Sequence, residues 1–152
     1  MKLSVLTRGL ILALASSALL ASTPTLAAET PASLKGAEVV DAAKAKSLMD
    51  GGAKMIDTRV ANEYAEAHIK GAINVPYKEK SPKAADFDAS LDSFDLSKLP
   101  ADKNAAIITQ CNGAECWKSY KGAVAAIKAG HKKVYWFRSG FPDWKAKGFP
   151  VE

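Results

Sequence analysis

The sequence contains few of the residues from which metal centres and disulfide scaffolds are built. Its 152 residues include two cysteines, Cys111 and Cys116, and two histidines, His68 and His131. A protein metal site needs several such ligands close together, so the chain predicts no metal centre and no other cofactor. Disulfide scaffolds spread their cysteines along the chain to close long loops, whereas these two occupy one short segment, which favours local chemistry.

The chain also lacks an apolar run long enough to span a bilayer. The run from Leu10 to Leu20 is short, follows the basic residues Lys2 and Arg8, and leads into small residues around Ala27 and Ala28. This order is typical of a secretory signal peptide. We therefore expect residues 1–28 to be removed, the mature protein to be periplasmic or secreted, and no stable membrane insertion after cleavage.

Positive charge is present without being concentrated. The chain has 21 basic and 16 acidic residues, a formal net charge of +5, which falls to +3 when Lys2 and Arg8 leave with the signal peptide. The lysines are dispersed rather than aligned in a stripe, so a nucleic-acid partner is not expected. A weak attraction for small anions stays open.

After the signal peptide, the sequence predicts a flexible leader and one domain. Residues 29–37 are polar and include Pro31 and Gly36, so we expect them to be ordered only where something docks them. Residues 38–152 contain no internal repeat. Their length is in the commonest range for a single domain with its own core.

Within that domain, short apolar segments alternate with helical patterns. We expect strands at 54–57, 105–109 and 133–137, a short apolar run at 72–75, and helices at 41–49, 62–67, from the cysteine segment to about 129, and 142–147. Residues 77–100 are polar and predicted as an ordered connection. The alternation predicts an α/β domain with a mainly parallel central sheet flanked by helices. Ligand sites of such sheets lie at the carboxyl ends of strands, where Cys111 is expected.

The position of Cys111 suits a reactive thiol. It follows a predicted strand and precedes a helix, so backbone N–H groups and the positive end of a helix dipole are expected nearby. Both stabilise a thiolate and lower the pKa of a cysteine. Gly113 allows the backbone to curl with its N–H groups inward, which also suits a bound oxyanion or persulfide.

Several segments together resemble the rhodanese family, and the resemblance extends over the whole predicted domain. Its elements are Met55–Arg59, Glu63–Tyr64, Ala67–Pro76, Ser139–Phe141, Trp144, Gly148 and Pro150–Val151. The resemblance implies a three-layer rhodanese-like fold with sulfurtransferase activity and gives Cys111 the role of the sulfur carrier. It also implies a substrate-binding loop, formed by Asn112, Gly113, Ala114, Glu115, Cys116, Trp117 and Lys118.

The loop departs from the family pattern at its end. Family members close a six-residue loop with an arginine, whereas here Lys118 and Ser119 stand where Arg-Ser is expected, which makes the loop two residues longer. In an ungapped alignment, Cys116 replaces the arginine instead. A wider loop resembles the phosphatase branch of this fold, but lysine cannot grip a phosphate bidentately as arginine does. We therefore favour sulfur transfer over phosphate hydrolysis.

Cys116 has three interpretations. A metal ligand is disfavoured, because His68 and His131 are the only histidines that could complete the site. The other two stay open. As a resolving thiol it attacks an oxidised or persulfidated Cys111 and closes a disulfide. Alternatively, it is a buried cysteine that packs in the first turn of the helix beside Trp117.

Other residues are expected to support the site. Asp57 and Arg59 resemble structural members of the family signature that hold loops by hydrogen bonds, and His68 is expected to be a satisfied, partly buried histidine. Arg138 follows a predicted strand and is either an anion clamp or a solvated charge. The carboxylate of Glu115 is expected to oppose anion binding.

Three functions are consistent with these features. The first is transfer of sulfane sulfur from a donor such as thiosulfate, through a Cys111 persulfide, to a thiophilic acceptor. The second is a thiol–disulfide redox module that uses Cys111 and Cys116 with an exported thiol partner. The third is a binding domain on a rhodanese scaffold. The expected partners are thus a small sulfur-containing anion, a protein persulfide or an exported thiol protein.

Overall fold

A computed structural model describes residues 28–152, and the predicted signal peptide therefore lies almost wholly outside the described residues. Five strands form one sheet in the order β1-β5-β4-β2-β3, and every neighbouring pair is parallel. The strands are β1 (Ala37–Val39), β2 (Lys54–Asp57), β3 (Ile73–Asn74), β4 (Ala106–Gln110) and β5 (Lys133–Phe137). The α/β class and the parallel sheet predicted from the sequence are confirmed.

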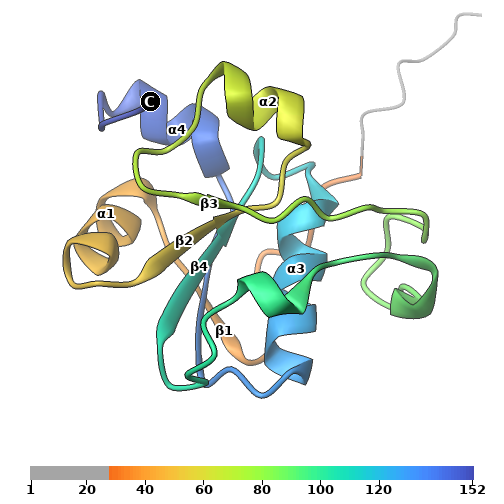
Figure 1. Cartoon of the computed structure of the whole chain (residues 1–152). Coiled ribbons are helices and arrows are strands. Elements are labelled where there is room, and N and C mark those ends of the chain that lie inside the picture. The colour runs from red at the N-terminus through yellow and green to blue at the C-terminus, as the bar shows by residue number, and fades with distance from the viewer. Residues whose placement is uncertain (1–27) are drawn as a thin grey trace, which may run out of the picture.

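Helices cover both faces of this sheet, as Figure 1 shows. The helices are α1 (Ala42–Asp50), α2 (Ala61–Glu66), α3 (Trp117–Lys128) and α4 (Gly140–Ala146). Ala42 and Ala45 of α1 share one apolar cluster with Phe141 and Trp144 of α4, whereas Ala123 of α3 belongs to a second cluster. The sheet is therefore the middle layer of three, with α1 and α4 on one side and α3 on the other. No helix in residues 28–152 is long and apolar enough to cross a membrane.

Local sequence signals explain where α1 begins and ends. The carboxylate of Asp41 accepts a hydrogen bond from the Lys44 N–H at 2.8 Å and so caps the first turn. Gly52 then takes a φ of +98°, a conformation that favours glycine, and the chain turns into β2.

The polar connection predicted at 77–100 contains the short 3-10 helices η1 (Ala89–Leu91) and η2 (Leu96–Lys98). A buried ion cluster fastens it to α3. The fully buried Lys121 ammonium lies 2.8 Å from a Glu79 carboxylate oxygen, 3.7 Å from Asp92, and donates to the Ser81 hydroxyl at 2.7 Å. Burial raises the pKa of Asp92, but hydrogen bonds from Ser81, Lys80 and Tyr77 outweigh it and hold the pKa well below its usual range.

The structure differs from the sequence prediction at the start of the domain. β1 was not expected, and it pairs with β5 at the sheet edge through Glu38 and Tyr135. Residues 29–37, predicted as a flexible leader, lie against the domain, with Thr30 buried and Leu34 bridged to Ala37. The reason is a set of polar contacts that Glu29 and Thr30 make to Ala114 and Arg138, described below.

Candidate active site

Cys111 lies where β4 ends, at the carboxyl edge of the sheet. In register, Gln110 of β4 stands between Asp57 of β2 and Phe137 of β5, so three strand ends meet beside the cysteine. Cys111 is 1 % exposed. The structure thus brings the predicted sulfur carrier to the edge at which parallel sheets bind ligands.

The loop that follows Cys111 presents unpaired backbone donors. The N–H of Cys116 donates to the Gly113 carbonyl at 3.1 Å, whereas no acceptor in the described part of the chain takes a hydrogen bond from the N–H groups of Asn112 to Glu115. Gly113 has a φ of +127°, as the predicted curl of the backbone requires. Such a curl, followed by the start of α3, suits a bound anion.

The loop is closed by a disulfide between Cys111 and Cys116, whose Cα atoms are 6.1 Å apart. Cys116 is also the residue that precedes α3, but its side chain does not cap the helix. Cys111 is buried and Cys116 is half-buried, so the second cysteine is the more exposed residue of the two. A pair held in this way is suited to thiol–disulfide exchange.

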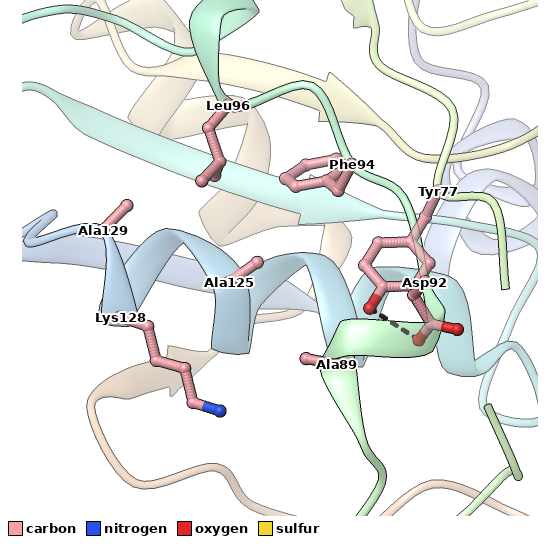
Figure 2. Close-up of a pocket in the computed structure, with 8 residues that line it drawn as sticks. All are labelled: Tyr77, Ala89, Asp92, Phe94, Leu96, Ala125, Lys128 and Ala129. Carbon is pink, nitrogen blue, oxygen red and sulfur yellow. Dashed lines mark hydrogen bonds between the residues drawn. The ribbon is translucent and has the colours of Figure 1, made fainter. Parts of the chain in front are cut away.

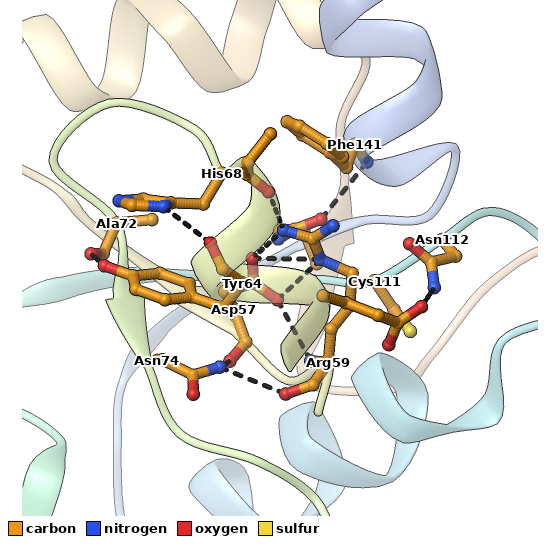
Figure 3. Close-up of polar contacts among 12 residues, drawn as sticks. Asp57, Arg59, Tyr64, His68, Ala72, Asn74, Cys111, Asn112 and Phe141 are labelled. Atoms are coloured by element: carbon orange, nitrogen blue, oxygen red, sulfur yellow. Dashed lines mark hydrogen bonds and ion pairs between the residues drawn. The ribbon is translucent and has the colours of Figure 1, made fainter. Parts of the chain in front are cut away.

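Asp57 and Arg59 form a buried ion pair beside the loop (Figure 3). The Arg59 guanidinium donates to both carboxylate oxygens of Asp57, with Nη2 2.6 Å from Oδ2, and a further bond reaches the Ala67 carbonyl at 2.9 Å. The same guanidinium lies 4.2 Å from the centre of the Phe141 ring. The pair therefore joins the end of β2 to the start of α4 and is engaged in positioning rather than exposed to a ligand.

The start of α4 holds the backbone of Cys111. The Phe141 N–H donates to the Cys111 carbonyl at 2.8 Å and to the Gln110 side-chain oxygen at 3.1 Å. Gly140 has a φ of +63°, and a Cβ added to it would overlap that same carbonyl. The fully buried Gln110 side chain has an amide nitrogen without a hydrogen-bond partner among residues 28–152. Gln110 and Gly140 were not predicted as site residues, although Gly140 stands in a segment that carries the family resemblance.

Further contacts join α2 to the loop and to the turn before β3. The Asn112 amide donates to a Glu63 carboxylate oxygen at 2.6 Å. The Tyr64 hydroxyl donates to the Ala72 carbonyl at 2.7 Å, and burial together with the charge of Asp57 raises the pKa of Tyr64, which keeps this donor protonated. The ring of His68 stacks on Tyr64 at 3.7 Å, and its Nδ1 lies 2.8 Å from the Tyr64 carbonyl. His68 is thus partly buried and hydrogen-bonded, as expected, and Glu63 is a loop contact that the sequence prediction missed.

Arg138 contacts the leader rather than an open anion site. Its guanidinium donates to the Thr30 carbonyl at 2.7 Å and to the Thr30 hydroxyl at 3.1 Å, and it pairs with Glu29 at 3.0 Å. Thr30 in turn donates from its N–H and its hydroxyl to the Ala114 carbonyl. The sequence leaves two roles open for Arg138, anion clamp or solvated charge, and in the structure its partly exposed guanidinium is engaged by Glu29 and Thr30.

Lys118 borders a hollow of about 360 Å³ beside the loop. Asn112, Glu115, Cys116, Trp117, Glu79 and Lys83 complete its lining. Basic and acidic groups are therefore mixed, and the carboxylate of Glu115 faces the same space as the ammonium of Lys118. A hollow of about 350 Å³ in another part of the fold lies between residues 89–96 and the far end of α3 (Figure 2) and includes none of the predicted site residues.

Within residues 28–152, no three Cys, His, Asp or Glu side chains gather in a way that would hold a metal ion. The groups that surround Cys111 include the sulfur of Cys116, the loop N–H groups and the neighbouring Lys83 and Lys118.

Comparison with known proteins identifies the class to which this fold and loop belong. Residues 41–147 match the rhodanese-like domain family, and the chain is a member of that family. It is 29% identical over 124 residues to Thiosulfate sulfurtransferase 18 of Arabidopsis thaliana, an alignment that covers 78% of this chain and 88% of the relative. Membership and this relative support a sulfurtransferase at the level of the family.

Solved structures share the fold. The BH2092 protein of Bacillus halodurans superposes with a TM-score of 0.57 at 24% identity and covers 76% of this chain and 77% of its own. The Alr3790 protein of Anabaena superposes with a TM-score of 0.54 at 25% identity and covers 74% of this chain and 90% of its own. The rhodanese-like architecture predicted from the sequence is thus confirmed.

Proposed function

We propose that this protein is a sulfurtransferase in which Cys111 carries sulfane sulfur as a persulfide, from a donor such as thiosulfate to a thiophilic acceptor. The observation that carries the proposal is the placement of Cys111 at the end of β4, before a loop in which the N–H groups of residues 112–115 have no partner in residues 28–152. These donors and the start of α3 favour a thiolate over a thiol and then stabilise the anionic persulfide. The name of the Arabidopsis relative supports thiosulfate as donor.

The reactive state in this proposal is the reduced protein. A sulfur that is already bonded to Cys116 is not a nucleophile, so Cys111 accepts sulfur only after its disulfide is reduced. The Cys111 thiolate then attacks the outer sulfur of thiosulfate, and sulfite leaves with the electron pair of the broken S–S bond. A thiol or cyanide subsequently removes the sulfur from the persulfide.

Substitution of the carrier tests the proposal. Cys111→Ser should abolish sulfur transfer from thiosulfate to cyanide and leave the fold intact, because a hydroxyl is nearly isosteric with a thiol but does not ionise at neutral pH. The measurement is the rate of thiocyanate formation by pre-reduced protein, with circular dichroism as the check on folding. Wild-type activity in the variant, or a reduced wild type that is inactive with every sulfane donor, would reject the carrier role and favour the binding-domain alternative.

A second candidate function is thiol–disulfide exchange with a partner protein. The disulfide itself favours it, because both cysteines of the described chain are engaged and one of the two residues is half-buried rather than buried. In this role, a partner thiolate attacks Cys116 and Cys111 leaves as the stabilised thiolate. The intact mass of the Cys116→Ser variant, which cannot close the disulfide, separates the two functions: thiosulfate adds one sulfur to a carrier and leaves the mass of a redox module unchanged.

Export is part of the proposal and is supported by the basic start, the short apolar run and the small residues at 27–28. The compartment then determines whether Cys111 and Cys116 rest as a disulfide or as two thiols. An oxidising exterior favours the closed disulfide, so a dithiol reductant must reach the protein before it accepts sulfur.

A further inference from the structure

Two sulfur atoms meet within one short loop that begins at the predicted sulfur carrier. Cys111 and Cys116 are bonded, and their Cα separation of 6.1 Å lies within the range that ordinary disulfides adopt. The backbone that places Cys111 at the end of β4 thus also places Cys116 where its sulfur reaches the Sγ of Cys111. No third cysteine is present in the chain to compete for either sulfur.

The surroundings of the two cysteines assign them different roles. Cys111 is 1 % exposed and its carbonyl is fixed by the Phe141 N–H, whereas the half-buried Cys116 borders the hollow that Lys83 and Lys118 also line. Cys116 belongs to no strand and precedes the first turn of α3. The buried sulfur is therefore the fixed centre, and Cys116 is the group that approaches it from the solvent side.

We infer that Cys116 removes the sulfur from the Cys111 persulfide as hydrosulfide, so that the protein is a sulfide-releasing thiosulfate reductase. The inference rests on the proposed persulfide at Cys111. It adds a product, sulfide. It also assigns the removal of the outer sulfur to Cys116, whereas a sulfurtransferase with one cysteine needs an external acceptor for that step.

The steps balance in atoms and electrons. The Cys111 thiolate first takes the outer sulfur of thiosulfate, and sulfite departs with the electron pair of the broken S–S bond. The Cys116 thiolate, having released its proton to solvent, then attacks the Sγ of Cys111. The bond to the outer sulfur breaks, and that sulfur leaves as hydrosulfide with the electron pair and a proton. The two cysteines lose two electrons in forming their disulfide, and the transferred sulfur gains both.

Proximity favours this route over transfer to a dilute external thiol. A group tethered in the same short loop competes at an effective concentration of about millimolar or above, which exceeds that of a scarce acceptor. The product of the step is the disulfide that the structure contains.

An external dithiol then reduces the disulfide and restarts the cycle. Its first thiolate attacks the accessible Cys116, because Cys111 is buried. Cys111 departs as the thiolate that the loop N–H groups and α3 stabilise, and a lower leaving-group pKa speeds this exchange. The second thiol of the reductant then displaces Cys116, so the reductant becomes a disulfide and both cysteines are free.

A single-turnover experiment tests the inference. Full-length mature protein is reduced, freed of reductant without air, and mixed with thiosulfate, after which sulfite, sulfide and intact protein mass are measured. The wild type should release one equivalent each of sulfite and sulfide and lose the mass of two hydrogens. Cys116→Ser should release sulfite, gain the mass of one sulfur on Cys111, and give at least about tenfold less sulfide, since the tethered thiol is missing.

Two controls separate failure of the inference from failure of the proposed function. Cys111→Ser, which keeps Cys116, should release neither sulfite nor sulfide. A wild type that holds a stable persulfide and releases no sulfide would overturn the inference and leave the carrier role intact, whereas absence of sulfite from both wild type and Cys116→Ser would overturn both. Cys116→Ala, folded by circular dichroism, repeats the test should the serine variant be unstable.

Discussion

Gly140 lies directly against the backbone of Cys111, the proposed sulfur carrier. Its φ of +63° is one that L side chains rarely adopt, and the space where a Cβ would stand is filled by the Cys111 carbonyl and the Gly113 N–H. The following residue, Phe141, donates to that same carbonyl. A side chain at position 140 must therefore displace either α4 or the loop.

The substitution Gly140→Ala should lower the free energy of unfolding by roughly 3 kcal/mol or more, because about 1–2 kcal/mol of backbone strain adds to the displacement of packed backbone. Gly148→Ala is the matched control. Gly148 has a similar φ of +68° but nothing within 4 Å of an added Cβ, so only the backbone strain applies. Chemical denaturation of both variants measures the difference, and equal losses of stability would show that the contact with Cys111 is unimportant.

The sequence predicts the position of a residue where that position depends on its own segment. Cys111 follows a strand and precedes a helix, and this local order is sufficient to predict its place at the sheet edge. Glu63 and Gln110 were missed because their contacts, with Asn112 and with the Phe141 N–H, join segments far apart in the chain. The pairing of Arg138 with Glu29 and Thr30 was missed for the same reason.

Among the secondary-structure elements, those with a short apolar run are predicted by the sequence. Elements that are defined by contacts with distant segments are not. The sequence predicted β2, β4 and β5 because each is a short apolar run that becomes buried. β1 has three residues, two of them exposed, so it carries no such pattern and is defined only by its partner β5. α4 begins two residues before the predicted Pro142, because the start of the helix is fixed by contacts to Cys111.

Helix α3 connects the loop after Cys111 to the polar connection that precedes β4. Lys121, one turn beyond Trp117, is buried with Glu79 and Asp92 and fixes the connection 77–94 against the helix. Removing one member of a buried ion cluster leaves an uncompensated charge, so such a cluster holds its segments in one arrangement. The first turn of α3, which carries Lys118, is thereby held beside the loop.

We expect Lys118 to hold the anionic donor, and the two ends of α3 provide a matched test of this role. Lys118→Ala should raise the KM for thiosulfate about threefold to tenfold and change kcat little, because a flexible point charge attracts the anion without orienting it. Lys128→Ala removes the same charge from the last turn, where the residue lines the hollow in Figure 2, and should leave KM unchanged.

Ionic strength provides the independent check on this comparison. Salt screens exposed charges, so the difference in KM between wild type and Lys118→Ala should shrink as salt is added. A KM that is unaffected by Lys118→Ala at low salt would show that this lysine does not contribute to donor binding.

At the scale of the whole molecule, the two ends of the described chain both contribute to the site or its surroundings. Residues 28–30 lie over the loop and contact Ala114, Trp117 and Arg138. At the other end, Glu152 exchanges backbone hydrogen bonds with His68, and its carboxylate accepts one from the Gly71 N–H, which lowers its pKa. Glu29 and Thr30 of the predicted leader are therefore docked on the domain, which is the condition under which the sequence predicts an ordered leader.

We expect signal-peptide cleavage at a position that retains the contacts between the leader and the domain. We expect protein from the native host to begin at Ala28 or Glu29, because either start retains the bonds that Thr30 makes to Ala114 and Arg138. A chain that starts at Glu29 loses only the bond from the Trp117 indole to the Ala28 carbonyl, whereas one that starts at Leu34 loses them all. At about 0.5–1 kcal/mol for each of the six hydrogen bonds that residues 28–30 make, the Leu34 start should be less stable by roughly 3–6 kcal/mol than the Ala28 start. N-terminal sequencing identifies the native start, and thermal melts of the three recombinant chains measure the effect. Equal melting temperatures would show that the leader adds nothing to the domain, and a native protein that begins at Met1 in the membrane would contradict export.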